Sequence, residues 1–208
     1  MKIINCESQN SLYGLGSYFL ELKNLYDINK LPNKILLSGN KGTGKCTLAY
    51  HFINYIFSIN EKFSYNIKDF EINTNNRSFK LIQNKSHPNF FLIDVYKDKK
   101  VIDIDQIRNL IIYSSKQSFN NTPRFVLIDN IELMNIHSIN ALLKILEEPF
   151  DNMNFILINN NKVLLKTLTS RCINFKISIS FKKSIETINS IIDGDIYELV
   201  NPNLIYHY

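Results

Sequence analysis

The sequence predicts an α/β domain in which helices cover a parallel β-sheet. Strands of a parallel sheet are buried on both faces, so they read as continuous apolar runs rather than as alternating ones. Four such runs stand out, at residues 35–37, 90–93, 125–128 and 155–158, and segments with helical apolar spacing separate them. The run at 125–128 ends on Asp129, which indicates a strand whose C-terminal tip carries an acid.

Length and composition fit one domain, or one large domain and the start of a second. The 208 residues are 45% hydrophobic and 21% charged, which allows a sizeable core. No apolar run approaches the about 18 residues of a membrane span, and the first residues lack the pattern of a signal peptide, so we expect a cytoplasmic protein without membrane contact. A net charge of +5 and a pI near 9.0 permit contact with nucleic acid without requiring it.

The three cysteines lie far apart in the sequence. They are Cys6, Cys46 and Cys172, and none of them belongs to a CxxC pair. This spacing argues against a disulfide framework and against a structural zinc site.

The first helix is expected at residues 8–26. Four apolar residues lie near one face of it, although Gly14 and Gly16 weaken the pattern. These four are Leu12, Leu15, Phe19 and Leu22. Pro32 ends the segment, and residues 35–37 form the first buried strand.

A phosphate-binding loop follows this strand. Residues 39–45 read GNKGTGK, which matches GxxxxGK between a strand and an apolar helix. Gly39, Gly42 and Gly44 let the backbone curl so that several N–H groups converge on phosphates. A helix that begins near Lys45 adds its positive end, and the Lys45 ammonium reaches the outer phosphates. The alternative is a Gly-Lys loop that arose by chance.

One position of the loop departs from the motif. Cys46 stands where Ser or Thr would ligate Mg²⁺, and a thiol is a poor ligand for a hard cation. Thr47 is one position late, and we expect its side chain to point elsewhere.

The middle of the chain carries weaker signals. Residues 60–86 are polar and predict a variable connection with one weak helix or strand. His87 has no partner at metal-ligand spacing, which favours a structural or capping role, and residues 97–100 read as a solvated turn. Asp103 can cap a helix in which Ile104, Ile107 and Ile111 share a face.

A helix should follow Asp129. Asn135 is a candidate N-cap and Pro149 forbids continuation. Its apolar face is formed by Ile139, Leu142, Leu143 and Leu146. Glu147 and Glu148 fall in the last turn, where the helix dipole disfavours negative charge, so a purely structural helix would rather have Lys or Arg there.

The last part of the chain begins with a strand at 155–158. A short basic helix starting near Lys162 then runs into Ser170, Arg171 and Cys172. Alternating apolar residues from Ile173 to Ile179 predict a final strand, and residues 184–192 a final helix.

Two motifs carry a family resemblance. Residues 140–149, NALLKILEEP, and 170–172, SRC, resemble the LLKxLEEP and SRC motifs of bacterial DNA polymerase III clamp-loader subunits, gamma/tau and delta-prime, of the AAA+ class. The likeness runs from about residue 31 to 175 and is weakest at 60–86. It implies a five-stranded AAA+ P-loop NTPase core at 1–178 and the beginning of a small helical lid at 179–208, with too little chain for a collar domain. The four-cysteine zinc module that related subunits often carry is missing.

The resemblance also assigns site positions. An ATPase of this class needs a magnesium-binding hydroxyl, an acid that holds the metal through water, and a carboxylate that activates water; here these positions are Cys46, Asp129 and Asn130. An amide cannot accept a proton near neutral pH. Glu132 would face the same side as Asn130 if the strand continued, and so could replace it. The polar residue that senses the γ-phosphate would fall at Asn159 or Asn160.

This pattern favours a delta-prime subunit, which does not hydrolyse ATP but offers Arg171 to a neighbour's ATP. ATP or ADP with Mg²⁺ would then bind weakly or in a vestigial way, and no metal site is assigned. Expected partners are the gamma/tau and delta subunits, the sliding clamp indirectly, and primer-template DNA. The alternatives are a gamma/tau-type motor that uses Glu132, an unrelated P-loop kinase, and a surface salt bridge as the only role of Arg171.

Overall fold

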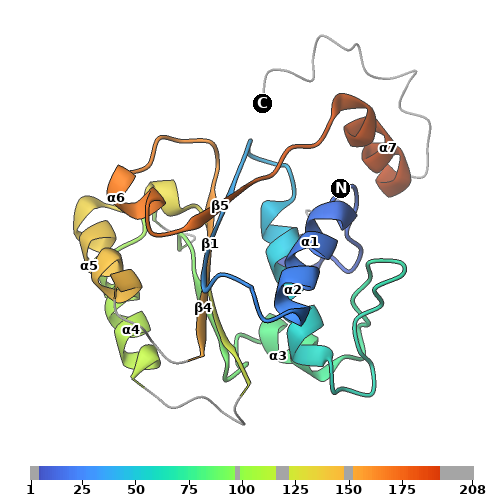
Figure 1. The fold of residues 1–208 in the computed structure, drawn as a ribbon, viewed down its shortest axis with the longest axis horizontal. Coiled ribbons are helices and arrows are strands. Elements are labelled where there is room, and N and C mark those ends of the chain that lie inside the picture. The colour runs from blue at the N-terminus through green and yellow to red at the C-terminus, as the bar shows by residue number, and fades with distance from the viewer. Residues whose placement is uncertain (1–4, 97–98, 116–121, 148–151, 193–208) are drawn as a thin grey trace.

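The computed structural model describes residues 5–96, 99–115, 122–147 and 152–192. Five parallel strands form one sheet in the order β2-β3-β4-β1-β5 (Figure 1). Their bounds are β1 Lys34–Ser38, β2 Phe90–Ile93, β3 Arg124–Ile128, β4 Met153–Asn159 and β5 Ile173–Lys176. All five predicted strands are present, which confirms the α/β class and the five-stranded parallel sheet.

Helices cover both faces of the sheet (Figure 1). One layer holds α1 (Gly16–Asp27), α2 (Lys45–Ser58) and α3 (Arg77–Gln83), and the other holds α4 (Ile104–Ser114), α5 (Ile136–Glu147) and α6 (Lys166–Thr169). Successive strand residues point to opposite layers, so Leu37 belongs to the core under α2 and Leu36 to the core under α5. The short helices η1 (Cys6–Ser8) and η3 (Ile131–Leu133) and the helix α7 (Phe181–Ile192) complete the described chain.

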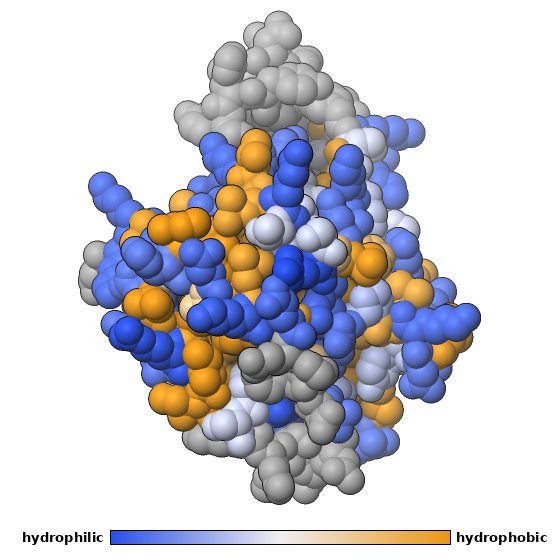
Figure 2. Space-filling view, turned by 60° about the vertical axis from the view of Figure 1, so that its left-hand side comes forward, coloured by the Kyte–Doolittle hydropathy of each residue, from blue (hydrophilic) through white to orange (hydrophobic). Residues whose placement is uncertain are grey.

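No helix in the described part of the chain is long and apolar enough to cross a membrane. Exposed apolar side chains occur among charged ones on the face that α4, α5 and α6 form, as Figure 2 shows. They include Ile111, Ile112, Ile136 and Leu165.

The first helix is shorter than predicted. It begins at Gly16 rather than at residue 8, because Ser11 and Leu12 pair in extended form with Glu71 and Phe70. The Leu12 N–H donates to the Phe70 carbonyl at 3.0 Å, and Gly14 turns the chain with φ +68°. Leu12 is buried as expected, but from an extended segment and not from a helix.

The weak middle region contains one helix, as predicted. Asn76 caps α3 by accepting the Phe79 N–H at 2.8 Å. The structural role predicted for His87 fits its contacts: its ring stacks on Phe57 with centroids 4.1 Å apart, and burial lowers its pKa to about 4. Residues 97 and 98 of the predicted turn lie outside the described residues.

The prediction for α4 was partly wrong. Asp103 occupies the N-cap position, but its side chain makes no capping bond and pairs with Lys99 instead. Ile107 is buried whereas Ile111 is 47% exposed. Leu110 takes the expected core position because the buried face runs through residues 106, 107, 110 and 114.

The last elements differ from prediction only at their ends. Asn135 caps α5 by accepting the Ser138 N–H at 2.8 Å, as predicted, and Pro149 lies outside the described residues. The basic helix α6 begins at Lys166 and not near Lys162. The final strand ends at Lys176, and α7 begins three residues earlier than expected.

Candidate nucleotide-binding site

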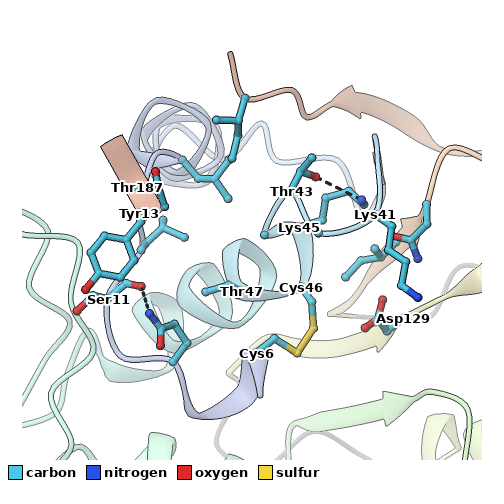
Figure 3. A pocket seen from close by; sticks show the side chains of 18 of the residues that line it. Cys6, Ser11, Tyr13, Lys41, Thr43, Lys45, Cys46, Thr47, Asp129 and Thr187 are labelled. Atoms are coloured by element: carbon cyan, nitrogen blue, oxygen red, sulfur yellow. Dashed lines mark hydrogen bonds between the residues drawn. A yellow bond between two sulfur atoms is a disulfide. The ribbon is translucent and has the colours of Figure 1, made fainter. Parts of the chain in front are cut away.

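A pocket of about 620 Å³ lies at the C-terminal ends of β1, β3 and β4 (Figure 3). Residues 41–47 of the glycine-rich loop and of α2 form one wall, and the segment before α1 forms another. Asp129, Asn130 and Asn160 line it from the strand tips, and Thr187 of α7 closes it on a further side. Ligands of open α/β sheets bind at such strand tips.

The loop has the backbone of a phosphate cradle. Gly42 and Gly44 have φ of +83° and +79°, values that L side chains rarely adopt. Gly39 does not line the pocket, and its role is close packing: a Cβ there would overlap the carbonyl oxygen of Ile177. The helix α2 begins at Lys45, so its unpaired N–H groups and positive end face the loop.

Lys45 is folded back onto its own loop. The side chain is buried, and Nζ donates to the carbonyl oxygens of Gly39 at 2.9 Å and Asn40 at 2.6 Å. Burial lowers the pKa of Lys45, while the charges of Asp129 and Glu132 act in the opposite direction. In this structure the ammonium therefore bridges two carbonyl groups of its own loop.

The cysteine spacing argued against a disulfide framework, but the structure contains one disulfide. Cys46 is bonded to Cys6 with Cα atoms 5.8 Å apart, because η1 packs on α2. A separation of 40 residues without a spacing motif gave no sequence signal for this pair. In this form the Cys46 sulfur is no ligand for Mg²⁺. Thr47 lines the pocket, and its side chain extends away from Cys46 and Asp129 (Figure 3).

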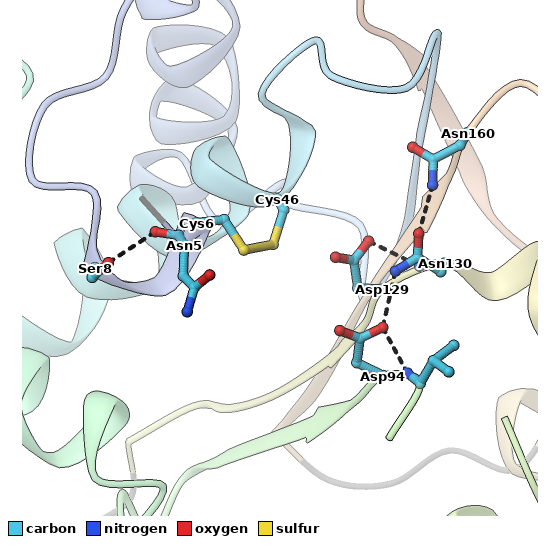
Figure 4. The surroundings of a disulfide bond; sticks show 9 residues. Asn5, Cys6, Ser8, Cys46, Asp94, Asp129, Asn130 and Asn160 are labelled. Atoms are coloured by element: carbon cyan, nitrogen blue, oxygen red, sulfur yellow. Dashed lines mark hydrogen bonds between the residues drawn. A yellow bond between two sulfur atoms is a disulfide. The ribbon is translucent and has the colours of Figure 1, made fainter. Parts of the chain in front are cut away.

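Polar side chains at the strand tips form one network (Figure 4). The Asn130 N–H donates to Asp129 Oδ1 at 2.8 Å, and Asn130 Nδ2 donates to Asp94 Oδ1 at 2.9 Å. Asn160 Nδ2 donates to Asn130 Oδ1 at 2.8 Å and to Glu132 Oε1 at 2.8 Å. Burial raises the pKa of Asp129 to about 6, and the charge of Asp94 acts in the same direction. The hydrogen bond from the Asn130 N–H acts in the opposite direction and lowers this pKa.

Glu132 was expected to face the same side as Asn130 only if the strand continued beyond Asp129, and the strand does not continue. The strand ends at Ile128, Asn130 has φ +54°, and residues 131–133 form η3 instead of extending β3. Glu132 accepts both the N–H and the Nδ2 of Asn160. Its carboxylate is therefore engaged in the network at the strand tips.

The two candidate sensor residues have different surroundings. Asn159 is buried and closes a turn by donating from Nδ2 to the Lys162 carbonyl at 2.9 Å, so it does not line the pocket. Asn160 does line the pocket. The geometry therefore favours Asn160 for nucleotide contact over Asn159.

Arg171 lies outside the pocket, just after α6. Nη1 donates to the Thr167 carbonyl at 2.6 Å, and Nη2 pairs with the Glu147 carboxylate. This pair explains the acid in the last turn of α5: the Arg171 guanidinium offsets the unfavourable interaction of Glu147 with the helix dipole. The two motifs thus meet in space, and Glu148 lies outside the described residues.

Two further residues at the site, Asp94 and Cys6, were not predicted from the sequence. Asp94 follows the apolar run 90–93 in the same way that Asp129 follows the run 125–128. Because the carboxyl ends of parallel strands meet at one edge of the sheet, the sequence did contain a signal that places Asp94 beside Asp129. Cys6 had no such signal.

The fold and the loop define a P-loop domain of the AAA+ class. A family model described as "DNA polymerase III, delta subunit" matches residues 16–180, and the chain belongs to this family. A DNA polymerase III subunit delta' from Buchnera aphidicola (Schizaphis graminum) is 30% identical over 79% of this chain and 48% of the relative. A gamma subunit from the same organism is 32% identical over 79% of this chain and 43% of that relative. The clamp-loader resemblance is confirmed.

The chain spans about half the length of the curated relatives it matches. Two solved structures support the fold alone. A gamma subunit-related protein from Thermotoga maritima has a TM-score of 0.59 at 20% identity, covering 85% of this chain and 51% of that one. The RuvB Holliday junction branch migration motor from the same organism has a TM-score of 0.51 at 17% identity, covering 91% and 56%.

Proposed function

We propose that this chain acts as a delta-prime-type subunit of the DNA polymerase III clamp loader. In this role it does not hydrolyse ATP, and it offers Arg171 to the ATP of a neighbouring subunit during loading of the sliding clamp onto primed DNA. The observation that carries the proposal is a P-loop site in which Cys46 stands at the magnesium position and Asn130 at the position of the base, in a chain that keeps a partly exposed arginine, Arg171. Residues 1–178 form the core in this proposal, and 179–208 begin a helical lid.

The pocket supports nucleotide binding without turnover. Gly42, Gly44, the start of α2 and Lys45 remain suited to phosphates. The donors at the magnesium position do not suit Mg²⁺, because Cys46 offers sulfur. Asn130 donates from its amide nitrogen to Asp94 and has no basic site for a proton from water.

Arg171 can leave its own pair at little cost. Its side chain is 32% exposed and that of Glu147 is 52% exposed, and such surface pairs contribute about 0–1 kcal/mol. An arginine finger contributes about 10³ to 10⁵ in rate, which corresponds to roughly 4–7 kcal/mol of transition-state stabilisation. Contact with a neighbour's phosphate would therefore outweigh the bond to Glu147.

Exposed apolar residues flank Arg171 in the sequence, as a subunit contact would require. Val163 is fully exposed, and Leu165 and Ile173 are exposed by 41% and 55%. We propose that this surface meets another clamp-loader subunit of the gamma/tau or delta kind. Contact with the sliding clamp and primer-template DNA would occur through the assembled complex.

A gamma/tau-type motor is the second candidate. It is favoured by gamma relatives as similar as the delta' ones. ATP turnover of the chain alone, then with gamma/tau and delta subunits, separates the two. The proposal expects no turnover alone; turnover that disappears in Glu132→Gln would assign a motor subunit instead.

The trans role needs its own test in the assembled complex. Arg171→Ala should lower ATP turnover in part, because other sites keep their own arginines, and should slow clamp loading more. Arg108→Ala is a matched control, since Arg108 is an exposed arginine paired with Asp105 on α4. Normal loading by the Arg171→Ala complex would reduce Arg171 to a surface salt bridge.

A further inference from the structure

Three potential metal ligands converge beside the phosphate loop. The Sγ atoms of Cys6 and Cys46 and a carboxylate oxygen of Asp129 all lie within 4.8 Å of one another. In a tetrahedral zinc site, bond lengths of about 2.3 Å to sulfur and 2.0 Å to oxygen place ligand atoms roughly 3.5–3.8 Å apart. We propose that Cys6, Cys46 and Asp129 bind a thiophilic divalent cation such as Zn²⁺ once the disulfide is reduced.

Cys6 is held in place without the disulfide. The segment that follows it is fixed by buried His51, whose Nε2 lies 3.0 Å from the Gln9 carbonyl oxygen. His51 Nδ1 is in turn 2.9 Å from the Tyr65 hydroxyl. The Ile72 N–H donates to the Asn10 carbonyl at 2.8 Å. Reduction therefore leaves the Cys6 thiol close to Cys46.

The other two ligands come from rigid elements. Cys46 is in the first turn of α2, and Asp129 follows β3, where its N–H donates to the Ile93 carbonyl at 2.9 Å. One Asp129 oxygen accepts the Asn130 N–H at 2.8 Å, which orients the carboxylate. Figure 4 shows the disulfide and this carboxylate on facing sides of the same space.

The local charge favours a cation there. Asp94 and Glu132 lie near enough to Asp129 to disfavour its charge, and none of the ion pairs among the described residues includes Asp129. Lys45 donates to its own loop rather than to this carboxylate. Two thiolates, one carboxylate and Zn²⁺ would leave a single negative charge beside Lys45 and the positive end of α2.

The ligand set selects the metal. Thiolates favour Zn²⁺ over Mg²⁺, whose hard-oxygen requirement they do not meet. All three residues line the pocket, which gives the ion an entry path and leaves a fourth position for water. The proposed site thus differs from a magnesium site at the same loop in two ways: its ligand atoms include sulfur, and one of them comes from Cys6.

Disulfide and metal exclude each other. Reduction by a phosphine breaks the S–S bond, converts the phosphine to its oxide with an oxygen atom from water, and leaves two thiols that keep the two protons of that water. Metal binding then releases the two thiol protons. The oxidised chain therefore offers one carboxylate and no thiolate.

Co²⁺ is the probe, because its thiolate complexes absorb in the near ultraviolet and visible range. The full chain, reduced with a phosphine and freed of metal, should bind one Co²⁺ per monomer with thiolate-to-cobalt bands, and Zn²⁺ should displace it while Mg²⁺ should not. Cys6→Ser and Cys46→Ser should each weaken Co²⁺ binding at least about 100-fold, since outer-shell changes alone cost 10- to 100-fold. Asp129→Asn should weaken it about tenfold or more and keep the thiolate bands.

Cys172→Ser is the matched control, because Cys172 is a buried free cysteine packed in the core of the α5 layer. It should leave Co²⁺ affinity unchanged, and circular dichroism checks that every variant is folded. The proposal is overturned if the reduced chain shows no thiolate band, if the band depends on Cys172, if Asp129→Asn binds as tightly as the wild type, or if one metal bridges two chains.

Discussion

Asp129→Asn should stabilise the oxidised chain at neutral pH. The pKa of Asp129 is about 6 in the fold and about 3.9 in an unfolded chain, so the folded state holds this proton more tightly. The stability linked to that proton is present below about pH 4 and is lost as pH rises through 6. The difference of about two units corresponds to at most about 3 kcal/mol above pH 6, and solvent in the pocket reduces this to about 1–2 kcal/mol. Asparagine removes the charge and keeps an oxygen for the Asn130 N–H.

Urea unfolding of both proteins from pH 4 to pH 8, with a chelator present, measures this effect. The variant should be more stable by about 1–2 kcal/mol at pH 7, and the gain should shrink toward pH 4. The difference between the two proteins is the readout, because the buried histidines change stability in the opposite sense. Glu21→Gln, an exposed change on α1, should stay within about 0.5 kcal/mol at every pH. A variant that is no more stable than wild type at pH 7 would refute the reasoning.

Three further predictions concern other parts of the chain. His51 is buried and burial lowers its pKa to about 4, so the fold loses stability as pH falls from about 6.5 to 4; His51→Gln should flatten this slope in the same unfolding assay although it lowers stability at pH 7. Gly39→Ala should destabilise the fold by more than about 1 kcal/mol and weaken binding of a fluorescent ATP analogue, because the added Cβ overlaps Ile177; equal thermal stability would contradict the packing argument. Arg171→Lys should restore little of the clamp loading that Arg171→Ala is expected to lose, since the point charge of lysine lacks the forked geometry of guanidinium. Full rescue by lysine would mean that Arg171 contributes only its charge.

The sheet was predictable because each buried strand is a short continuous apolar run. The same argument explains why Asp129 could be placed at a strand tip from sequence alone. Helix ends were less predictable where tertiary pairing competes with local pattern: Leu12 has helical spacing to Leu15, but its N–H bonds to Phe70. Ile111 also matched the helical pattern of α4, yet the buried face passes through Leu110.

At the candidate site, the loop and the strand-tip positions were predictable and the long-range pairs were not. The glycines and Lys45 form a local motif, so their placement follows from neighbouring residues. The bonds between Cys6 and Cys46, and between Arg171 and Glu147, join elements that only the fold brings together. Nothing in their spacing distinguishes these partners from other residues of the same type.

The position of β1 in the sheet has a consequence for folding during synthesis. This strand precedes all the others in the chain, but its two neighbours, β4 and β5, begin only at Met153 and Ile173. β2 and β3 can pair with each other earlier. β1, which leads into the phosphate loop, has no neighbouring strand to pair with until most of the domain has left the ribosome. Contacts of such long sequence separation form slowly and leave apolar strands exposed in the meantime. Chaperone dependence should therefore concentrate on nascent chains that have completed β3 and still lack β4.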